Sequence, residues 1–249
     1  MSLHLLPFYQ ATGGTTFVQT NALTTEIFPT NANTNYVSRT DLYAVAAVAI
    51  GSDLKRAQLT SPSLARITPV QIQQLILSGG IPTAPPITYF LQDPPVLYKE
   101  EEFKIQALNR TLTSANYAAL IISDVYPLAA PARGPYFWLH GSHTTSCTGN
   151  AFTTVTISWD QSIMGGDYFV CGMAAYSSTG LFARIFGPTQ VFRPGCVVQQ
   201  GYGNRADPLF TTPSLSNYYK FNAYQMPSVE FYCTQSDGGG DIFLLVARA

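Results

Sequence analysis

The order of apolar and polar residues along the chain is typical of β-strands rather than helices. Residues 102–109 alternate, with Phe103, Ile105 and Ala107 on one face, which is the pattern of a half-buried strand. Residues 41–50 are almost uniformly apolar, which predicts a strand buried on both faces or at an interface. Thr, Val, Ile and aromatic residues predominate in the other apolar stretches, as they do in strands. We predict further strands at 15–28, 55–59, 87–91, 117–123, 136–140, 152–159, 168–176, 181–186, 196–200, 218–224, 228–233 and 242–247.

One segment, residues 68–77, has the period of a helix. Thr68 can cap its start and Pro69 occupies the first helical position, where proline is favoured. The apolar side chains fall at i, i+3 and i+4, which places them on one face. These side chains are Ile72, Leu75 and Ile76. We therefore predict one short helix here.

Four segments of the first half are echoed in the second half, in the same order. Their offsets are 129, 126, 128 and 125 residues, close to half of the 249-residue chain. One such match means little, because strands resemble one another, but four collinear matches predict a tandem of two similar units. Two unrelated strand-rich halves are the alternative. The matched pairs are 21–25 with 150–154, 41–46 with 167–172, 102–105 with 230–233, and 116–121 with 241–246.

The tandem divides the chain into four parts. We predict an N-terminal arm at 1–14, a first unit at 15–126, a Pro-rich linker at 127–135 and a second unit at 136–249. Two units of about 125 residues can each bury a core. About eight strands in each, with long irregular loops, predict an all-β fold of two tandem jelly-roll β-sandwiches, with the one short helix in the first.

Charge is scarce along the whole chain. Charged residues make up 11%, and the formal net charge is −1, whereas about 25% is typical of soluble domains. Such a surface is poorly protected against association, which predicts that copies or partners cover much of it. A secreted β domain with a neutral surface is the alternative. The absence of a Lys/Arg run argues against direct nucleic-acid binding. The start of the sequence lacks the features of a signal peptide, and its apolar runs are too short to span a bilayer.

Few residues offer catalytic or metal chemistry. His140, His143 and Cys147 come nearest to a metal motif, but strand residues 140 and 143 point to opposite faces, and the spacing differs from that of zinc sites. We therefore expect two polar strand histidines. Glu100 to Glu102 also alternate faces, which favours a solvated strand start over a carboxylate site. The chain has neither a nucleophile elbow nor a phosphate loop. We expect no catalytic constellation, no metal or other cofactor, and no small-molecule substrate.

The cysteines lie in the second half, and none forms a Cys-x-x-Cys pair. Burial as free thiols is favoured because cysteine packs as a small hydrophobe, although one or two disulfides stay open as alternatives. The four residues are Cys147, Cys171, Cys196 and Cys233.

Five residues are candidates for contacts between subunits. Arg184 lies within an apolar stretch and Arg193 precedes Pro-Gly, and arginine is favoured at interfaces. An outward strand residue and a turn residue are the plainer interpretation. In the N-terminal arm, Leu5, Leu6 and Phe8 are apolar and could dock on a neighbouring copy.

Together, the half-length repeat and two local segments resemble a known family. The segments are 167–173, Asp-Tyr-Phe-Val-Cys-Gly-Met, and 184–195, which begins Arg-Ile-Phe and ends Phe-Arg-Pro-Gly. The chain resembles the double jelly-roll major capsid proteins of tailless icosahedral viruses, which include membrane-containing bacteriophages and, more distantly, adenovirus. In that family two upright sandwiches stand side by side, and three chains form a pseudo-hexagonal capsomer.

The resemblance implies a structural protein and not an enzyme. It implies a major capsid subunit that trimerises, self-assembles into an icosahedral shell, and resides in the virion after synthesis in the host cytoplasm. Minor capsid or vertex proteins and an underlying membrane are further partners that it allows. The rival interpretation is a lectin-like or receptor-binding β-sandwich module, in which loop aromatics stack on sugars. Those aromatics are Tyr202, Phe210, Tyr218 and Tyr219. An enzyme is the third alternative.

Overall fold

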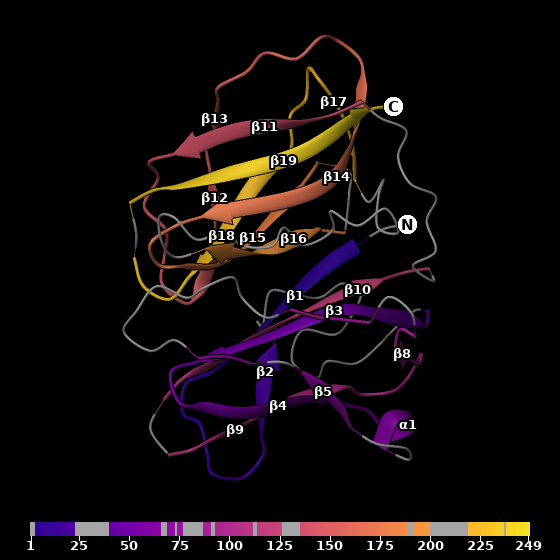
Figure 1. The fold of residues 1–249 in the computed structure, drawn as a ribbon, viewed down its shortest axis with the longest axis vertical. Helices are drawn as coiled ribbons and strands as arrows, with labels where there is room; N and C mark the ends of the chain where they lie inside the picture. Colours follow the sequence, from indigo (N-terminus) through magenta and orange to yellow (C-terminus); the bar gives the residue numbers. More distant parts are fainter. Residues whose placement is uncertain are drawn as a thin grey trace. The chain divides into compact units, whose positions relative to one another are not determined.

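A computed structural model describes residues 3–22, 40–65, 69–72, 74–76, 87–90, 93–111, 114–125, 135–188, 192–199, 219–236 and 238–249. The chain forms two compact units. The first unit is Leu5–Tyr126, and the second unit is Met1–His4 together with Pro127–Ala249. Strands make up nearly all of the regular structure in both, which confirms the predicted all-β class (Figure 1).

The first unit consists of two layers of strands. One sheet has the order β1 (Leu3–Gln10), β10 (Asn116–Ser123), β3 (Leu42–Gly51), β6 (Gln74–Ile76). The other has the order β2 (Val18–Ala22), β9 (Lys104–Asn109), β4 (Leu54–Thr60), β5 (Val70–Ile72). The short strands β7 (Thr88–Tyr89) and β8 (Val96–Leu97) pair with β3.

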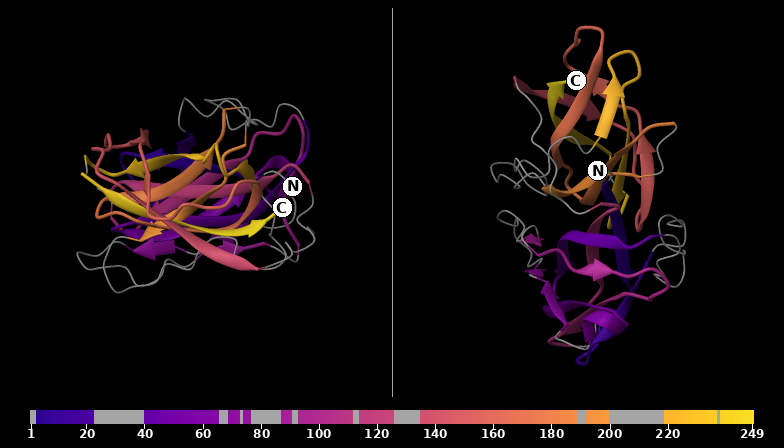
Figure 2. Two further views of the ribbon diagram at one scale, coloured as in Figure 1. Left: turned by 90° about the horizontal axis from the view of Figure 1, so that it is seen from above. Right: turned by 90° about the vertical axis from the view of Figure 1, so that its right-hand side faces the viewer.

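The second unit repeats this arrangement. One sheet has the order β11 (Tyr136–His143), β19 (Gly240–Arg248), β14 (Asp167–Tyr176), β17 (Tyr219–Asn222). The other has the order β12 (Ala151–Val155), β18 (Ser228–Cys233), β15 (Gly180–Phe186), β16 (Gly195–Gln199). Figures 1 and 2 show the yellow strand β19 beside β11 and β14 in this unit.

The strand order is that of a jelly roll in both units. In each, the first and last long strands pair with each other, and the third strand, not counting the two-residue β13 (Ser158–Trp159), pairs with the last, which gives β1-β10-β3 and β11-β19-β14. The remaining strands give β2-β9-β4-β5 and β12-β18-β15-β16. The tandem of two similar units is therefore confirmed by their topology.

In each unit, strands that change partners join the two sheets. On one side of the first unit, β2 pairs with both β9 and β1. At the same place in the second unit, two successive strands divide these contacts, since β12 pairs with β18 and β13 pairs with β11. On the other side, β5 and β6 pair with β4 and β3, and β16 pairs with both β15 and β14. The strand order thus runs continuously from one sheet to the other, from β5 to β6 in the first unit and from β12 to β13 in the second, which keeps most strand edges paired.

The two units share even their irregularities. A bulge lies between Leu54 and Arg56 in β4, and another lies between Gly180 and Phe182 in β15. Both bulges occur one ladder position from the strand start, and the strands begin 126 residues apart. Equal bulges at equal places indicate that the repeat extends to the backbone register.

Apolar side chains from both sheets fill the interior of the first unit. Leu6 and Phe8 of β1 lie in this core, where the Phe8 ring meets the Phe103 ring edge-on at 6.3 Å. Phe8 is 1% exposed and Leu5 is also fully buried. Residues 3–10 therefore form a sheet strand rather than the expected extended arm, because their apolar side chains are buried within the same chain.

The predicted helix at 68–77 is wrong. Its described residues form β5 and β6, in which Ile72 is buried and Gln71 is exposed. The one described helix is α1 (Pro62–Ala65), where the Ser61 hydroxyl accepts a hydrogen bond from the Leu64 N–H at 3.2 Å. A capping hydroxyl followed by proline therefore does begin a helix, but at Ser61-Pro62, seven residues before the predicted Thr68-Pro69. A short apolar run alone cannot distinguish a helix from a strand. No helix in the described ranges is long and apolar enough to cross a membrane.

Candidate functional site

A buried cluster of charge lies on the outer side of the β12-β18-β15-β16 sheet. Arg184 of β15 and Glu230 of β18 are direct ladder partners, with exposed fractions of 2% and 7%. The Arg184 Nε donates to Glu230 Oε2 at 2.6 Å, and the Arg193 Nη1 donates to both carboxylate oxygens at 3.0 Å. One carboxylate therefore serves two guanidinium groups.

Aromatic rings and a backbone contact hold this cluster in place. The Arg184 Cζ lies 3.6 Å from the Phe152 ring centroid, and the Arg193 Cζ lies 4.8 Å from that of Phe186. The Arg193 N–H also donates to Nδ1 of His4 at 3.0 Å, and both residues belong to the second unit. Each guanidinium thus lies over an aromatic ring as well as against the carboxylate.

The proposed intersubunit contacts of Arg184 and Arg193 are not needed to explain these residues. Both bind Glu230 of the same chain, and the buried Arg184 offers no surface to a neighbour. Leu5, Leu6 and Phe8 are likewise buried, so the structure does not bring the five predicted assembly residues to one exposed surface. Sequence reasoning missed Glu230, which lies 46 residues from Arg184 and carries no local signal.

The first unit has a neutral row of side chains at the same place. Gln58 and Gln106 are ladder partners that occupy the positions of Arg184 and Glu230. The Gln58 Nε2 donates to Gln106 Oε1 at 2.8 Å, and Arg56 donates to Gln71 at 3.2 Å. Arg56 and Gln71 are exposed. We call this surface the glutamine face, which comprises Gln19, Arg56, Gln58, Gln71 and Gln106.

The opposite sheet of the second unit has an apolar outer surface. Alternate residues of β11 point outward, and Trp138 and Tyr136 remain 42% and 46% exposed. Their ladder partners on β19 are Leu245 and Ala247, and Phe169 of β14 lies opposite Ala247. We call this surface the aromatic face, which comprises Tyr136, Trp138, Phe169, Phe243 and Leu245. Residues 136–139 are apolar or aromatic at both strand faces, and that pattern could have revealed this surface from sequence.

Histidine and two carboxylates adjoin the aromatic face. His140 Nδ1 contacts Asp160, and its Nε2 lies 3.2 Å from Asp241 Oδ1. The imidazole stacks on Phe243 at 4.5 Å between centroids. Partial burial lowers the pKa of His140, but its hydrogen bonds with Asp160 and Asp241 outweigh that effect and raise the pKa above the usual 6.5. The ring therefore holds β11 to β19 and to the end of β13 when it is protonated.

A pH-dependent stability results from this raised pKa. The contribution of His140 is fully present below the unfolded pKa of about 6.5 and is lost as pH rises through the folded pKa. We expect His140→Gln to lower the free energy of unfolding most near pH 5.5 and least near pH 9. Urea unfolding followed by tryptophan fluorescence measures this difference. The Asp160→Asn/Asp241→Asn variant is the control, in which the same substitution has a smaller pH effect. A deficit that does not change with pH would contradict the assignment.

The other two residues weighed as a metal motif, His143 and Cys147, do not converge with His140. His143 is buried, and its ring lies 4.7 Å from that of Phe231, on the opposite face of β11 from His140. The four cysteines are buried and are not joined by disulfides, as the favoured prediction had it, and burial raises the pKa of Cys196 to about 12. In the part of the chain that the structure describes, no three His, Cys, Asp or Glu residues are grouped to hold a metal ion.

The three consecutive glutamates do not converge. Glu100 pairs with Lys99 at 3.6 Å, and Glu102 pairs with Lys104 at 3.3 Å, both at the surface. Glu101 instead accepts a hydrogen bond from the Ser63 N–H at 3.2 Å, beside α1. Each carboxylate thus has its own partner, as expected for a solvated strand start.

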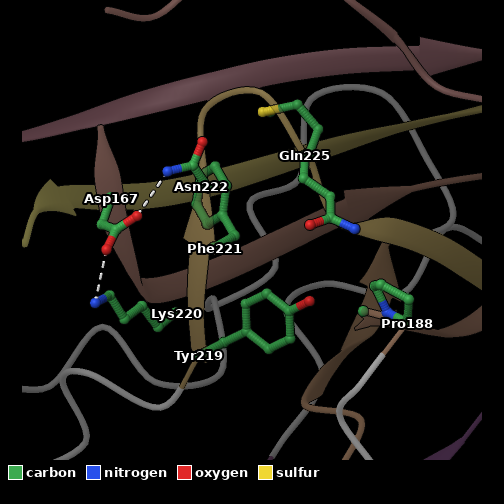
Figure 3. A pocket seen from close by; sticks show the side chains of 9 residues that line it. Asp167, Pro188, Tyr219, Lys220, Phe221, Asn222 and Gln225 are labelled. Carbon is green, nitrogen blue, oxygen red and sulfur yellow. Dashed lines mark hydrogen bonds and ion pairs between the residues drawn. The ribbon is translucent and has the colours of Figure 1, made fainter. Parts of the chain in front are cut away.

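A pocket of about 310 Å³ lies along β17 in the second unit (Figure 3). On one wall, the Asp167 carboxylate pairs with Lys220 at 2.8 Å and with the Asn222 amide at 2.7 Å, and these hydrogen bonds lower the pKa of Asp167. Pro188 and Gln225 lie across from them. The charged and amide groups of that wall, on Asp167, Lys220 and Asn222, are therefore bonded to one another.

The sugar-stacking aromatics of the rival interpretation are mostly outside the described residues, namely Tyr202, Phe210 and Tyr218. Tyr219 is described, and its side chain is 5% exposed. Burial raises the pKa of its hydroxyl to about 12. A ring so enclosed cannot stack on a sugar, so Tyr219 does not support a lectin-like site.

Comparisons with known proteins give one named likeness. No family model matches the chain, and no curated protein matches it by sequence. Among solved structures, the major capsid protein P2 from bacteriophage PM2 is similar at 8% identity, with 99% of this chain and 97% of that chain covered and a TM-score of 0.28. A TM-score this low carries no argument, so the functional interpretation depends on the strand order and the contacts within this chain.

Proposed function

We propose that this protein is a structural subunit that self-associates into a shell, in the manner of double jelly-roll major capsid proteins. The observation that carries the proposal is the tandem of two jelly rolls with one strand order and matched bulges. A duplicated jelly roll gives one chain two similar bodies, so a ring of three chains presents six similar bodies around its axis. The scarcity of charge, 11% of residues, fits surfaces that other copies cover.

We also propose the assembly steps that the resemblance to these capsid proteins implies. The subunit trimerises into pseudo-hexagonal capsomers, the capsomers close into an icosahedral shell, and the protein resides in the virion after synthesis in the host cytoplasm. Minor capsid or vertex proteins and an underlying membrane complete the assembly. We propose neither an enzymatic role nor direct nucleic-acid binding.

The mass of the purified protein tests the proposal. We expect light scattering to give trimers or larger closed species, and electron microscopy of the same fractions to show rings or particles. As a control, the same measurement is repeated at raised salt. We expect the mass to change little there, since contacts between weakly charged surfaces depend little on screening. A monodisperse monomer of about 27 kDa at every concentration, salt and pH would contradict it.

A further inference from the structure

The first residues of the chain are held by an acceptor that a proton removes. His4 of β1 is 2% exposed, and its Nδ1 lies 3.0 Å from the backbone nitrogen of Arg193. A backbone N–H only donates, so Nδ1 must present its lone pair, and the imidazole is the neutral form with its proton on Nε2. The Phe192 ring meets the His4 ring edge-on, at 6.3 Å between centroids. The hydrogen bond therefore exists only while His4 is neutral.

The segment that receives His4 is fixed by contacts of its own. The Arg193 Nη1 donates to both carboxylate oxygens of Glu230 at 3.0 Å. The Pro194 carbonyl accepts a hydrogen bond from the Ile185 N–H at 2.9 Å. Neither contact involves His4, so the loss of the His4 hydrogen bond leaves residues 192–194 in place. What it removes is a hold on the start of β1.

The charges of the receiving segment oppose a proton on His4. Arg193 and Arg184 of β15 share the one carboxylate of Glu230 on β18, so this group already has two cations for one anion. A protonated His4 would add a third cation to it. The ring is also buried, and burial disfavours the charged form because water cannot solvate it.

The strands around this contact supply no other group that changes charge near neutral pH. β1 lies between β2 and β10, and the sequences of these three strands contain no Asp, Glu, Lys or Arg. They contain Tyr9 and Tyr117, and tyrosine is ordinarily neutral below about pH 10. On β16, burial raises the pKa of Cys196 to about 12. Ordinary glutamates are protonated about two pH units below histidine, which separates Glu230 from His4.

We infer that His4 is a pH-sensitive latch, which holds Leu3 and His4 on the Arg193 segment when the ring is neutral and releases them when it takes up a proton. The inference goes beyond the proposed function, since the latch operates within a single chain. Its contribution is fully present above about pH 6.5, where ordinary histidines take up a proton, and is lost as pH falls. This sign is opposite to that of His140, which stabilises most in acid.

Hydrogen exchange of single backbone amides, measured by NMR at pH 7.5 and pH 5, tests the latch. A local opening that exposes an ordinary histidine becomes about thirtyfold more populated between these pH values. We therefore expect the protection of the Arg193 N–H, corrected for intrinsic exchange at each pH, to fall by the same factor. The Ile185 N–H is the internal control, because it binds Pro194 of the same segment and is expected to keep its protection.

Two variants identify the titrating group. Asparagine places an uncharged oxygen where histidine has Nδ1, so we expect His4→Asn to keep the Arg193 N–H equally protected at both pH values. His140→Gln removes the other histidine with a pH-dependent contact, and we expect it to retain the fall in Arg193 protection.

Each other result would overturn the latch. Equal protection of the Arg193 N–H at both pH values in the unchanged protein, or no protection at either, means that His4 does not hold this amide. A fall that Ile185 shares means that the 192–194 segment itself opens. A fall that persists in His4→Asn, or that vanishes in His140→Gln, assigns the titration to another group. Should His4→Asn fail to fold, the comparison of Arg193 with Ile185 in the unchanged protein still decides.

Discussion

Replacing Glu230 with Leu is expected to destabilise the second unit by about 3–5 kcal/mol, because Arg184 stays buried without its carboxylate. Arg193 is 36% exposed at its side chain and can turn to solvent, but Arg184 cannot, since the Phe152 ring lies 3.6 Å from its Cζ. The cost is therefore that of one trapped cation rather than of two lost hydrogen bonds.

Urea unfolding followed by tryptophan fluorescence measures this loss of stability in the second unit, where Glu230 lies. The chain has two tryptophans, Trp138 and Trp159, and both lie in the second unit. A double variant, Arg184→Met/Glu230→Leu, is expected to regain most of the stability, because packed apolar side chains often replace a buried ion pair without loss. A single variant within about 1 kcal/mol of the unchanged protein would show that Arg184 is not trapped.

The first unit supplies a matched control for the same position. Gln106 occupies the place of Glu230, and it bonds the neutral Gln58 at 2.8 Å. Gln106→Leu removes one neutral hydrogen bond at a partly exposed site, so we expect a loss of only about 1 kcal/mol. Equal losses at Gln106 and Glu230 would mean that charge adds nothing to the cluster.

The repeat could be predicted from sequence, but its register could be predicted only in part. The offset of 126 found for residues 41–46 and 167–172 is the structural one, since the bulges at Val45 and Cys171 are 126 residues apart. For β9 and β18 the two offsets differ. Asn109 and Cys233, which pair with the first residues of β4 and β15, are 124 residues apart, whereas the sequence match of 102–105 with 230–233 gave 128. A shift by an even number keeps the same side chains on each face, so alternation alone cannot detect it.

The candidate surfaces were less predictable than the fold. Low charge indicated association, but the residues chosen for it, Leu5, Leu6, Phe8, Arg184 and Arg193, are core or cluster residues. An apolar or stacked side chain has the same sequence signature whether it is buried by its own chain or by a neighbour. The distinction depends on strand order, which brings β1 between β2 and β10 and places Arg184 beside Glu230.

Replacing Phe8 with Ala distinguishes a core strand from an assembly arm. Phe8 is 1% exposed, contacts the Phe103 ring edge-on, and belongs to the core cluster of the first unit. We expect Phe8→Ala to lower the stability of this unit by about 3–5 kcal/mol, since the cavity adds to the lost transfer free energy. Phe8→Leu retains most of the volume and is expected to cost less than about 1.5 kcal/mol.

The two units can be followed separately in this experiment. Circular dichroism reports strands of both units, whereas tryptophan fluorescence reports the second unit alone. We therefore expect Phe8→Ala to move part of the dichroism transition to lower urea and to shift the fluorescence transition less. Val18→Ala, at an exposed position of the neighbouring β2, is the control and is expected to change stability by less than about 0.5 kcal/mol. If Phe8→Ala left the stability unchanged but abolished assembly, the predicted assembly arm would be supported instead. A side chain that docks on another copy contributes nothing to the stability of the isolated chain.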